Sequence, residues 1–240
     1  MKKIILCAVA ILSSLILLNS CTLDNNSTTQ PQSGAFLVAN VSPTSPKLSV
    51  YFNSTSKFFD TLRFGSYSPY AGPVNPGTYT FIVDSSGEAN PSKLKSTVTI
   101  EANKFYSYFI IDSFNKVKAS FINDVFKVPS SDSVYIRFFN FCPNSTSPVS
   151  LVNTADQHAW ASDRSFNDQS SNPQYIAFFE EPAGTYNFQL QGIAGDTLLK
   201  ATSVTLTGGK VYTLFAKGTI GSADTTKALA IGRLENYPQK

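Results

Sequence analysis

NPGTYTF (Asn75–Phe81) and EPAGTYNF (Glu181–Phe188) repeat one short pattern at two distant points of the chain: proline and glycine followed by Thr-Tyr-x-Phe. Proline ends the preceding segment, glycine adopts backbone angles that other residues resist, and Thr-Tyr begins a strand. We expect each tyrosine ring to fill one end of a β-sandwich while its hydroxyl group reaches a polar partner. The pattern is therefore structural, and its repetition indicates two related units.

Further blocks repeat in the same order along the chain. Their apolar and turn residues align, with Asn40 over Asn140 and Pro43 over Pro143. The offset between the two copies drifts, as expected when strands persist while loops change length. The sequence therefore predicts a tandem duplication, in which the aligned blocks are residues 35–43 with 135–143, 48–53 with 149–154, and 96–110 with 202–216.

The periodicity inside each copy is that of β-strands. Tyr186, Phe188 and Leu190 alternate with polar residues, which places apolar side chains on one face of a half-buried strand. Such segments recur after residue 20, separated by Pro, Gly, Asn and Ser, and no sustained helical period interrupts them. The expected fold is all-β, with one β-sandwich for each copy. Thr207–Lys210 (TGGK) is expected to form a hairpin turn.

The N-terminus has the features of a lipoprotein signal. Two lysines precede the apolar run Ile4–Leu18, which is short for a membrane-spanning helix and typical of a secretory signal. The run ends in LLNSC, which resembles the lipobox of bacterial lipoproteins, so we expect residues 1–20 to be a signal peptide and Cys21 to carry the lipid. The alternative is an ordinary signal peptide with a chance cysteine. Residues 21–33 are polar and predict a short flexible tether.

The cysteines, the residue after Cys21 and the charge balance indicate the role of Cys142, the location of the chain and the class of partner that it lacks. If Cys21 is lipidated, Cys142 is alone in the mature chain, and we expect it to be a buried apolar residue rather than a reactive thiol. Outer-membrane anchoring is favoured because Thr22, and not aspartate, follows Cys21; the sequence leaves the periplasmic face and the cell surface open. The 19 basic and 16 acidic side chains nearly balance, so no nucleic-acid partner is expected.

Taken together, these blocks resemble the bacterial domain of unknown function 4397 family. The first copy carries the similar motifs: a strand that runs into Asn40-x-x-Pro43, then SVYFN, LRFGSYSPY, PGTYTF and ANKFYSYFI. The second copy departs from them at residues 158–175, where it has extra residues. The resemblance implies immunoglobulin-like or prealbumin-like β-sandwiches, often in tandem in exported lipoproteins of Gram-negative bacteria, and no established catalytic residue. We expect two such domains at residues 34–128 and 132–240, with a groove at their junction.

The loop from Asn153 to Asn172, which departs most from its counterpart in the first copy, is the best candidate for ligand binding. It holds the single tryptophan, Trp160, together with His158 and Arg164. A tryptophan on a sandwich loop can stack against a sugar ring while charged neighbours bind its hydroxyl groups. The competing interpretation places Trp160 over Phe59 and Arg164 over Arg63, and makes Trp160 a core residue.

Two weaker signals concern exposed residues. Tyr67 and Tyr70, on a segment rich in Pro and Gly, are a second candidate for ligand binding as a stacking platform. Four triplets match a motif that some Gram-negative bacteria O-glycosylate, and the alternative is that they are strand residues without sugar: Asp60–Leu62, Asp132–Val134, Asp196–Leu198 and Asp224–Thr226.

The sequence lacks the motifs of nucleophilic catalysis, metal binding and phosphate binding. It has one histidine, and neither a nucleophile elbow, nor metal-ligand spacing, nor a glycine-rich phosphate loop. No metal, cofactor or enzymatic activity is therefore expected. We predict a non-enzymatic cell-envelope lipoprotein that presents two β-sandwich domains for binding to an envelope protein or a glycan. The alternative is a carbohydrate-active enzyme whose carboxylates lie far apart in the sequence.

Overall fold

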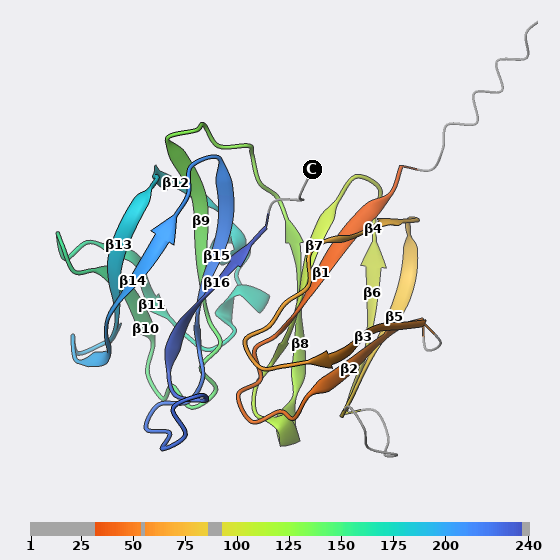
Figure 1. Cartoon of the computed structure of the whole chain (residues 1–240), viewed down its shortest axis with the longest axis horizontal. Helices are drawn as coiled ribbons and strands as arrows, with labels where there is room; N and C mark the ends of the chain where they lie inside the picture. The colour runs from red at the N-terminus through yellow and green to blue at the C-terminus, as the bar shows by residue number, and fades with distance from the viewer. Residues whose placement is uncertain (1–31, 54–55, 86–92, 237–240) are drawn as a thin grey trace, which may run out of the picture. The chain divides into compact units, whose positions relative to one another are not determined.

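The computed structural model describes residues 32–53, 56–85 and 93–236 (Figure 1). Within these residues the chain is all-β, as predicted: sixteen strands form four four-stranded sheets, and the helices are three short 3-10 turns. None of the helices in this part of the chain is long and apolar enough to cross a membrane. The expected signal peptide, Cys21 and nearly all of the expected tether lie outside the described residues.

The first half of the chain forms one pair of sheets. One sheet has the order β4-β1-β7-β8, and β1 pairs in parallel with β7. The other has the order β3-β2-β5-β6 and is antiparallel. A 3-10 turn, η1 (Phe114–Lys116), lies between β7 and β8. The strands are β1 (Gly34–Asn40), β2 (Leu48–Phe52), β3 (Ser56–Leu62), β4 (Ala71–Val74), β5 (Gly77–Ser85), β6 (Leu94–Ile100), β7 (Phe105–Ile111) and β8 (Lys118–Asp124).

The second half repeats this arrangement. Its sheets have the orders β12-β9-β15-β16 and β11-β10-β13-β14, and β9 pairs in parallel with β15. Two 3-10 turns, η2 (Asp168–Ser170) and η3 (Pro173–Ile176), lie between β11 and β12. The strands are β9 (Ser133–Asn140), β10 (Val149–Asn153), β11 (Ala159–Arg164), β12 (Phe179–Pro182), β13 (Gly184–Gly192), β14 (Thr197–Leu206), β15 (Lys210–Lys217) and β16 (Ala230–Glu235).

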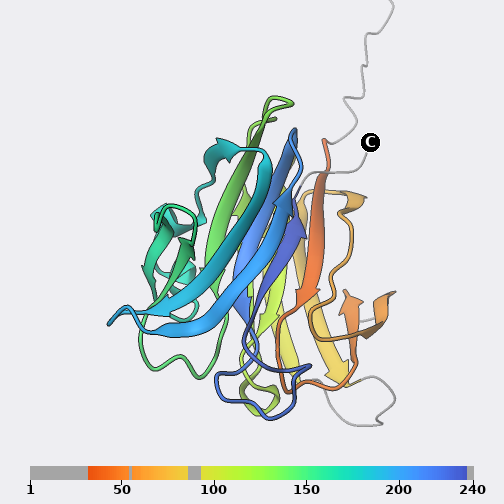
Figure 2. The same ribbon diagram turned by 60° about the vertical axis from the view of Figure 1, so that its left-hand side comes forward.

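The two sandwich-like units share their strand order and their corner hydrogen bonds. Figures 1 and 2 show β1 beside β7 and β9 beside β15, in each case with parallel pairing. The hydroxyl group of Tyr79 donates to the carbonyl oxygen of Asn75, and that of Tyr186 donates to the carbonyl oxygen of Pro182, each at 2.7 Å. The predicted polar partner of each tyrosine is therefore confirmed. The tandem duplication and the immunoglobulin-like type stay predictions, and these matched contacts support the duplication.

One predicted turn is wrong. Thr207–Lys210 joins β14 to β15, and these two strands belong to different sheets. The segment therefore crosses from one layer of the sandwich to the other instead of closing a hairpin. Gly209, at φ 76°, supplies the left-handed backbone conformation that this change of direction requires. The sequence pattern showed the glycine turn correctly, but a turn signal does not say which strands it connects.

The predicted alignment of Trp160 and Arg164 is also wrong, by one residue. Leu48 pairs with Leu62 in the first unit, and the equivalent Val149 pairs with Arg164 in the second. Arg164 therefore takes the place of buried Leu62, and not of Arg63. The same register places Trp160 over Phe58 instead of Phe59. Period-2 alternation along a strand does not fix register to one residue, because an irregularity in either strand shifts it.

Each sandwich has its own apolar core, and a third apolar cluster joins the two. We call it the junction cluster; it consists of Leu37, Ala39, Val41, Phe109, Ile111, Ile122, Phe139, Phe141, Phe215 and Leu234. These residues come from the sheets that contain β1 and β9, so these two sheets face each other. The central strands β1, β7, β9 and β15 are consequently covered on both faces, and almost all of their residues are buried.

A buried hydrogen-bonded network lies beside the junction cluster. Its centre is an ion pair between Asp124 of the first unit and Arg137 of the second, with side chains 0% and 1% exposed and 2.5 Å between Oδ1 and Nη2. The other carboxylate oxygen accepts hydrogen bonds from the hydroxyl groups of Tyr70 (2.5 Å) and Ser107 (2.7 Å). We call this set the junction network; it consists of Tyr70, Ser107, Asp124, Arg137, Thr213 and Asn236.

The remaining two members close the network into a ring. Arg137 Nε donates to the hydroxyl group of Thr213 (2.9 Å), which donates to the side-chain oxygen of Asn236 (2.5 Å). The amide nitrogen of Asn236 donates in turn to the hydroxyl groups of Tyr70 and Ser107, each at 3.2 Å. Burial, reinforced by the adjacent Asp124 carboxylate, raises the pKa of Tyr70 well above its ordinary value. The charges and hydroxyl groups satisfy one another, which is what makes their burial tolerable.

Candidate functional site

The connection between β11 and β12 is longer than its equivalent in the first unit. It spans residues 165–178 and contains η2 and η3, whereas the equivalent connection of the first unit spans residues 63–70. We call residues 165–178 the junction loop. It begins directly after Arg164, a charged residue at a position where the first unit has the buried Leu62.

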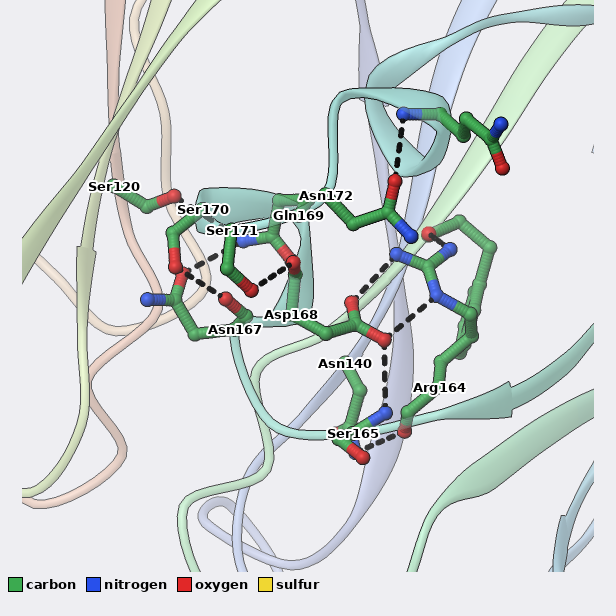
Figure 3. Close-up of polar contacts among 12 residues, drawn as sticks. Ser120, Asn140, Arg164, Ser165, Asn167, Asp168, Gln169, Ser170, Ser171 and Asn172 are labelled. Carbon is green, nitrogen blue, oxygen red and sulfur yellow. Dashed lines mark hydrogen bonds and ion pairs between the residues drawn. The ribbon is translucent and has the colours of Figure 1, made fainter.

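An arginine clamp fixes the junction loop. Arg164 is 5% exposed, and its Nη2 and Nε atoms donate to the two carboxylate oxygens of Asp168 at 2.6 and 3.0 Å. Its Nη1 donates to the carbonyl oxygen of Phe138 (2.6 Å), and the ring of Tyr175 lies 3.9 Å from its guanidinium carbon. Figure 3 shows this two-point contact. Such bidentate pairs hold both partners in one geometry, so Arg164 positions the loop.

Hydrogen bonds that involve amide side chains connect the junction loop to both units (Figure 3). Asn140 Nδ2 donates to the carbonyl oxygen of Arg164, and the backbone N–H of Asn167 donates to the carbonyl oxygen of Asn140. Asn167 adopts a left-handed φ of 56°, which turns the chain into η2. Gln169, 4% exposed, then donates from Nε2 to Asn167 Oδ1 (2.7 Å) and to Ser120 Oγ of β8 (3.2 Å).

A groove of about 330 Å³ lies where the junction loop approaches β8. One wall is made by β8, and the opposite wall by η2, η3 and the residues between them. Because the two walls belong to different units, the groove exists only while the junction holds them together. We call it the junction groove; its lining residues are Ala119, Ser120, Phe121, Ile122, Asn123, Gln169, Ser170, Ser171, Pro173 and Ile176.

The residues predicted from sequence to bind a ligand are not brought together at this groove. Trp160 is 8% exposed and packs against the rings of Tyr186 and Phe188, with centroids 4.6 and 4.7 Å away, which places it in the core of the second unit. It does border a smaller hollow of about 200 Å³ together with Arg164. His158 is exposed, and its backbone N–H bonds Asp156.

Tyr67 and Tyr70 do not form the stacking platform that the sequence suggested. Tyr67 is 41% exposed, whereas the hydroxyl group of Tyr70 is engaged in the junction network. Tyr70 also borders a hollow of about 390 Å³ next to the start of β1, and its ring meets Phe105 edge to face. One of the two rings is therefore exposed and the other has a structural role.

We searched the described residues for metal-binding groups and reactive side chains. None of them forms a group of three or more His, Cys, Asp or Glu side chains that could hold a metal ion. Cys142 is fully buried, as predicted, and burial raises the pKa of its thiol group, which disfavours the nucleophilic thiolate. Burial also raises the pKa of Glu181, an effect that nearby His158 partly offsets.

The four Asp-Ser/Thr triplets differ in accessibility. Ser133 is 9% exposed, and its hydroxyl group donates to Glu180 Oε1 at 2.7 Å. The other three hydroxyl groups belong to exposed residues: Thr61, Thr197 and Thr225. A bulky modification is therefore sterically compatible with three of the triplets and not with the one at Ser133.

Residues 35–151 match the model of a family described as a domain of unknown function (DUF4397). Residues 35–151 are therefore similar to this family. The match covers the described strands from β1 into β10, so it includes the first unit and the first strands of the second. The DUF4397 description assigns no activity, and no curated protein matches the chain.

Among solved structures, the chain is similar to "The Bacillus anthracis TIE protein", with 8% sequence identity and a TM-score of 0.24. The alignment covers 85% of this chain and 44% of that one, so the chain spans less than half the length of the matched structure. A likeness at this TM-score carries no argument about function.

Sequence reasoning anticipated a groove at the junction but missed the residues that form it. Gln169, Ser170 and Ser171 lie in the loop singled out for its Trp and His, yet they carry no recognisable motif. The available signal was the length of the second copy's loop relative to the first. An insertion that is also anchored by a buried arginine has a definite conformation, and ordered loops are where binding sites concentrate.

Proposed function

We propose that the chain is a non-enzymatic lipoprotein of the cell envelope that binds a partner in the junction groove. The observation that carries this proposal is that the groove's two walls belong to separate sandwich units held together by a buried ion pair. Such an arrangement pre-organises a binding surface, and pre-organisation lowers the entropy lost on binding. The DUF4397 family match leaves this function open, since its description names none.

The envelope location rests on the sequence at the N-terminus. The apolar run Ile4–Leu18 and the LLNSC motif support cleavage before Cys21 and lipidation of its sulfur. A diacylglyceryl group with a further acyl chain gives stable anchoring, which one acyl chain does not. The expected tether, residues 21–33, then separates the lipid from β1. We place the anchor in the outer membrane, and both of its faces remain candidates for the exposed side.

The first experiment tests the anchor. Cells that express the wild-type chain or Cys21→Ser are labelled with an alkyne analogue of a fatty acid, and the isolated protein is examined for label. We expect label on the wild type alone and release of Cys21→Ser from the membrane fraction. Label retained on Cys21→Ser contradicts lipidation at this residue.

The second experiment tests binding in the groove. Full-length lipidated chain in detergent is screened against two probes, a phage-displayed octapeptide library and a glycan array. Ser170 is exposed, lines the groove and has no side-chain hydrogen bond to Arg164 or Asp168, so Ser170→Trp is chosen to fill the groove. Ser203→Trp on the exposed part of β14 is the matched control. We expect binders whose affinity falls at least tenfold in Ser170→Trp and is unchanged in Ser203→Trp. If neither probe yields such a binder, the proposed function is wrong.

A further inference from the structure

The wall that β8 contributes to the junction groove is the edge of the strand and not one of its faces. Five consecutive residues, Ala119–Asn123, line the groove. Side chains of a strand alternate between its two faces, and here Phe121 packs on the first core while Ile122 belongs to the junction cluster. Since residues of both faces meet the groove, what they share is the backbone edge between them.

That edge is open to a further strand. β8 is the last strand of its sheet, bonded to β7 on one side, so its other side carries backbone N–H and C=O groups that no strand pairs. An edge of this kind is a template for β-strand addition, in which an extended peptide continues the sheet. The junction loop forms the second wall of a channel along this template.

The groove is lined by uncharged side chains only. Ser170 and Ser171 supply hydroxyl groups, Pro173 and Ile176 supply apolar surface, and no Asp, Glu, Lys, Arg or His is among the ten lining residues. The buried Oε1 atom of Gln169 has no hydrogen-bond partner among the described residues, so the groove wall holds one unused acceptor.

These features favour a peptide over a sugar. The single aromatic residue in the lining, Phe121, stacks on Tyr106 with ring centroids 4.8 Å apart and planes 9° from parallel. The ring is thus engaged within the first unit and offers no platform for a pyranose. The unpaired backbone edge, in contrast, matches the alternating donors and acceptors of an extended main chain.

We propose that the junction groove binds an extended, uncharged peptide segment of a partner protein, which adds to the sheet as a strand beside β8. This inference rests on the proposed function and specifies its ligand. Ile122 and Ile176 make the junction cluster continuous with the groove, so an apolar side chain of the ligand extends the apolar contact already present. The ligand therefore carries apolar residues at every second position, because alternate side chains point toward that cluster.

The test uses octapeptides selected from the phage library on the full-length chain, synthesised with single N-methyl groups at each position in turn. Strand addition uses every second N–H of the ligand, so methylation at alternate positions weakens binding by about two- to tenfold each, and methylation between them has no effect. Ser170→Trp and Ser171→Trp both weaken the unmodified peptides at least tenfold, and Ser203→Trp does not.

Three outcomes overturn the inference. Equal effects of methylation along the peptide rule out main-chain pairing with β8. Groove-dependent binders that come from the glycan array alone replace the peptide with a sugar and leave the proposed function intact. The absence of any groove-dependent binder in either probe overturns this inference together with the proposed function.

Discussion

Replacement of Asp124 by alanine tests whether the junction network holds the two units together. The carboxylate accepts hydrogen bonds from Arg137, Tyr70 and Ser107, and neither charged side chain is more than 1% exposed. Asp124→Ala therefore leaves the Arg137 guanidinium group buried without a counter-charge. Removal of one partner of a buried pair costs about 3–5 kcal/mol. At about 2–4 °C per kcal/mol for a chain of this size, Tm falls by about 6–20 °C.

The assay is differential scanning calorimetry with urea unfolding of the same variants. Because the lost contacts join the two units, we expect the Asp124→Ala endotherm to split into separate transitions of the two sandwiches. The double variant Asp124→Leu/Arg137→Met removes both charges and recovers part of the loss. Lys104→Ala, which breaks an exposed ion pair with Glu101, is the control and leaves Tm almost unchanged. A loss below about 1 kcal/mol in Asp124→Ala, well short of the cost of a broken buried pair, refutes this reasoning.

Three further predictions follow from burial and accessibility. Trp160→Ala removes a packed core aromatic, so it lowers the free energy of unfolding by about 3–5 kcal/mol while groove binding in the cold persists; loss of binding with unchanged stability contradicts this. Burial raises the pKa of Tyr108 to about 12 from 10.0, so the unfolded chain ionises first and stability declines as pH rises from about 10. Urea titrations should show that the free energy of unfolding declines less steeply with pH in Tyr108→Phe than in the wild type. Equal slopes in the two proteins contradict the raised pKa of Tyr108. If the Asp-Ser/Thr triplets are glycosylated in the native host, intact-peptide mass spectrometry finds sugar on exposed hydroxyl groups and none on Ser133; the expected sites are Thr61, Thr197 and Thr225.

The fold class could be predicted from sequence because local patterns determine it. The alternation around Tyr186 and Tyr79 identifies half-buried strands, and both tyrosines form the expected corner contact. The register of strand pairing was harder to predict. The alignment of the two copies placed Arg164 over Arg63, whereas strand pairing makes it equivalent to Leu62. Local patterns identify strands, whereas the pairing between strands depends on contacts across the sandwich.

The junction was harder to predict, although a signal existed. Phe105–Ile111 is an almost continuous apolar run, and such runs indicate strands covered on both faces, unlike the alternating strands around them. Arg137 interrupts a similar run in β9, which marks a charge that needs a buried partner. Its partner Asp124 lies in the other sandwich unit, and no periodicity links the two. A groove at the junction was expected, but the residues that line it could not be predicted, for the same reason.

The most direct test of the account is hydrogen–deuterium exchange of the full-length chain with and without a selected octapeptide. Binding in the junction groove predicts slower exchange in two segments, residues 118–124 of β8 and residues 168–176 of the junction loop. The amides of β14, an edge strand outside the groove, serve as the internal control and should not change. Protection that appears instead around Trp160, or that leaves β8 unchanged, contradicts the assignment of the groove as the binding site.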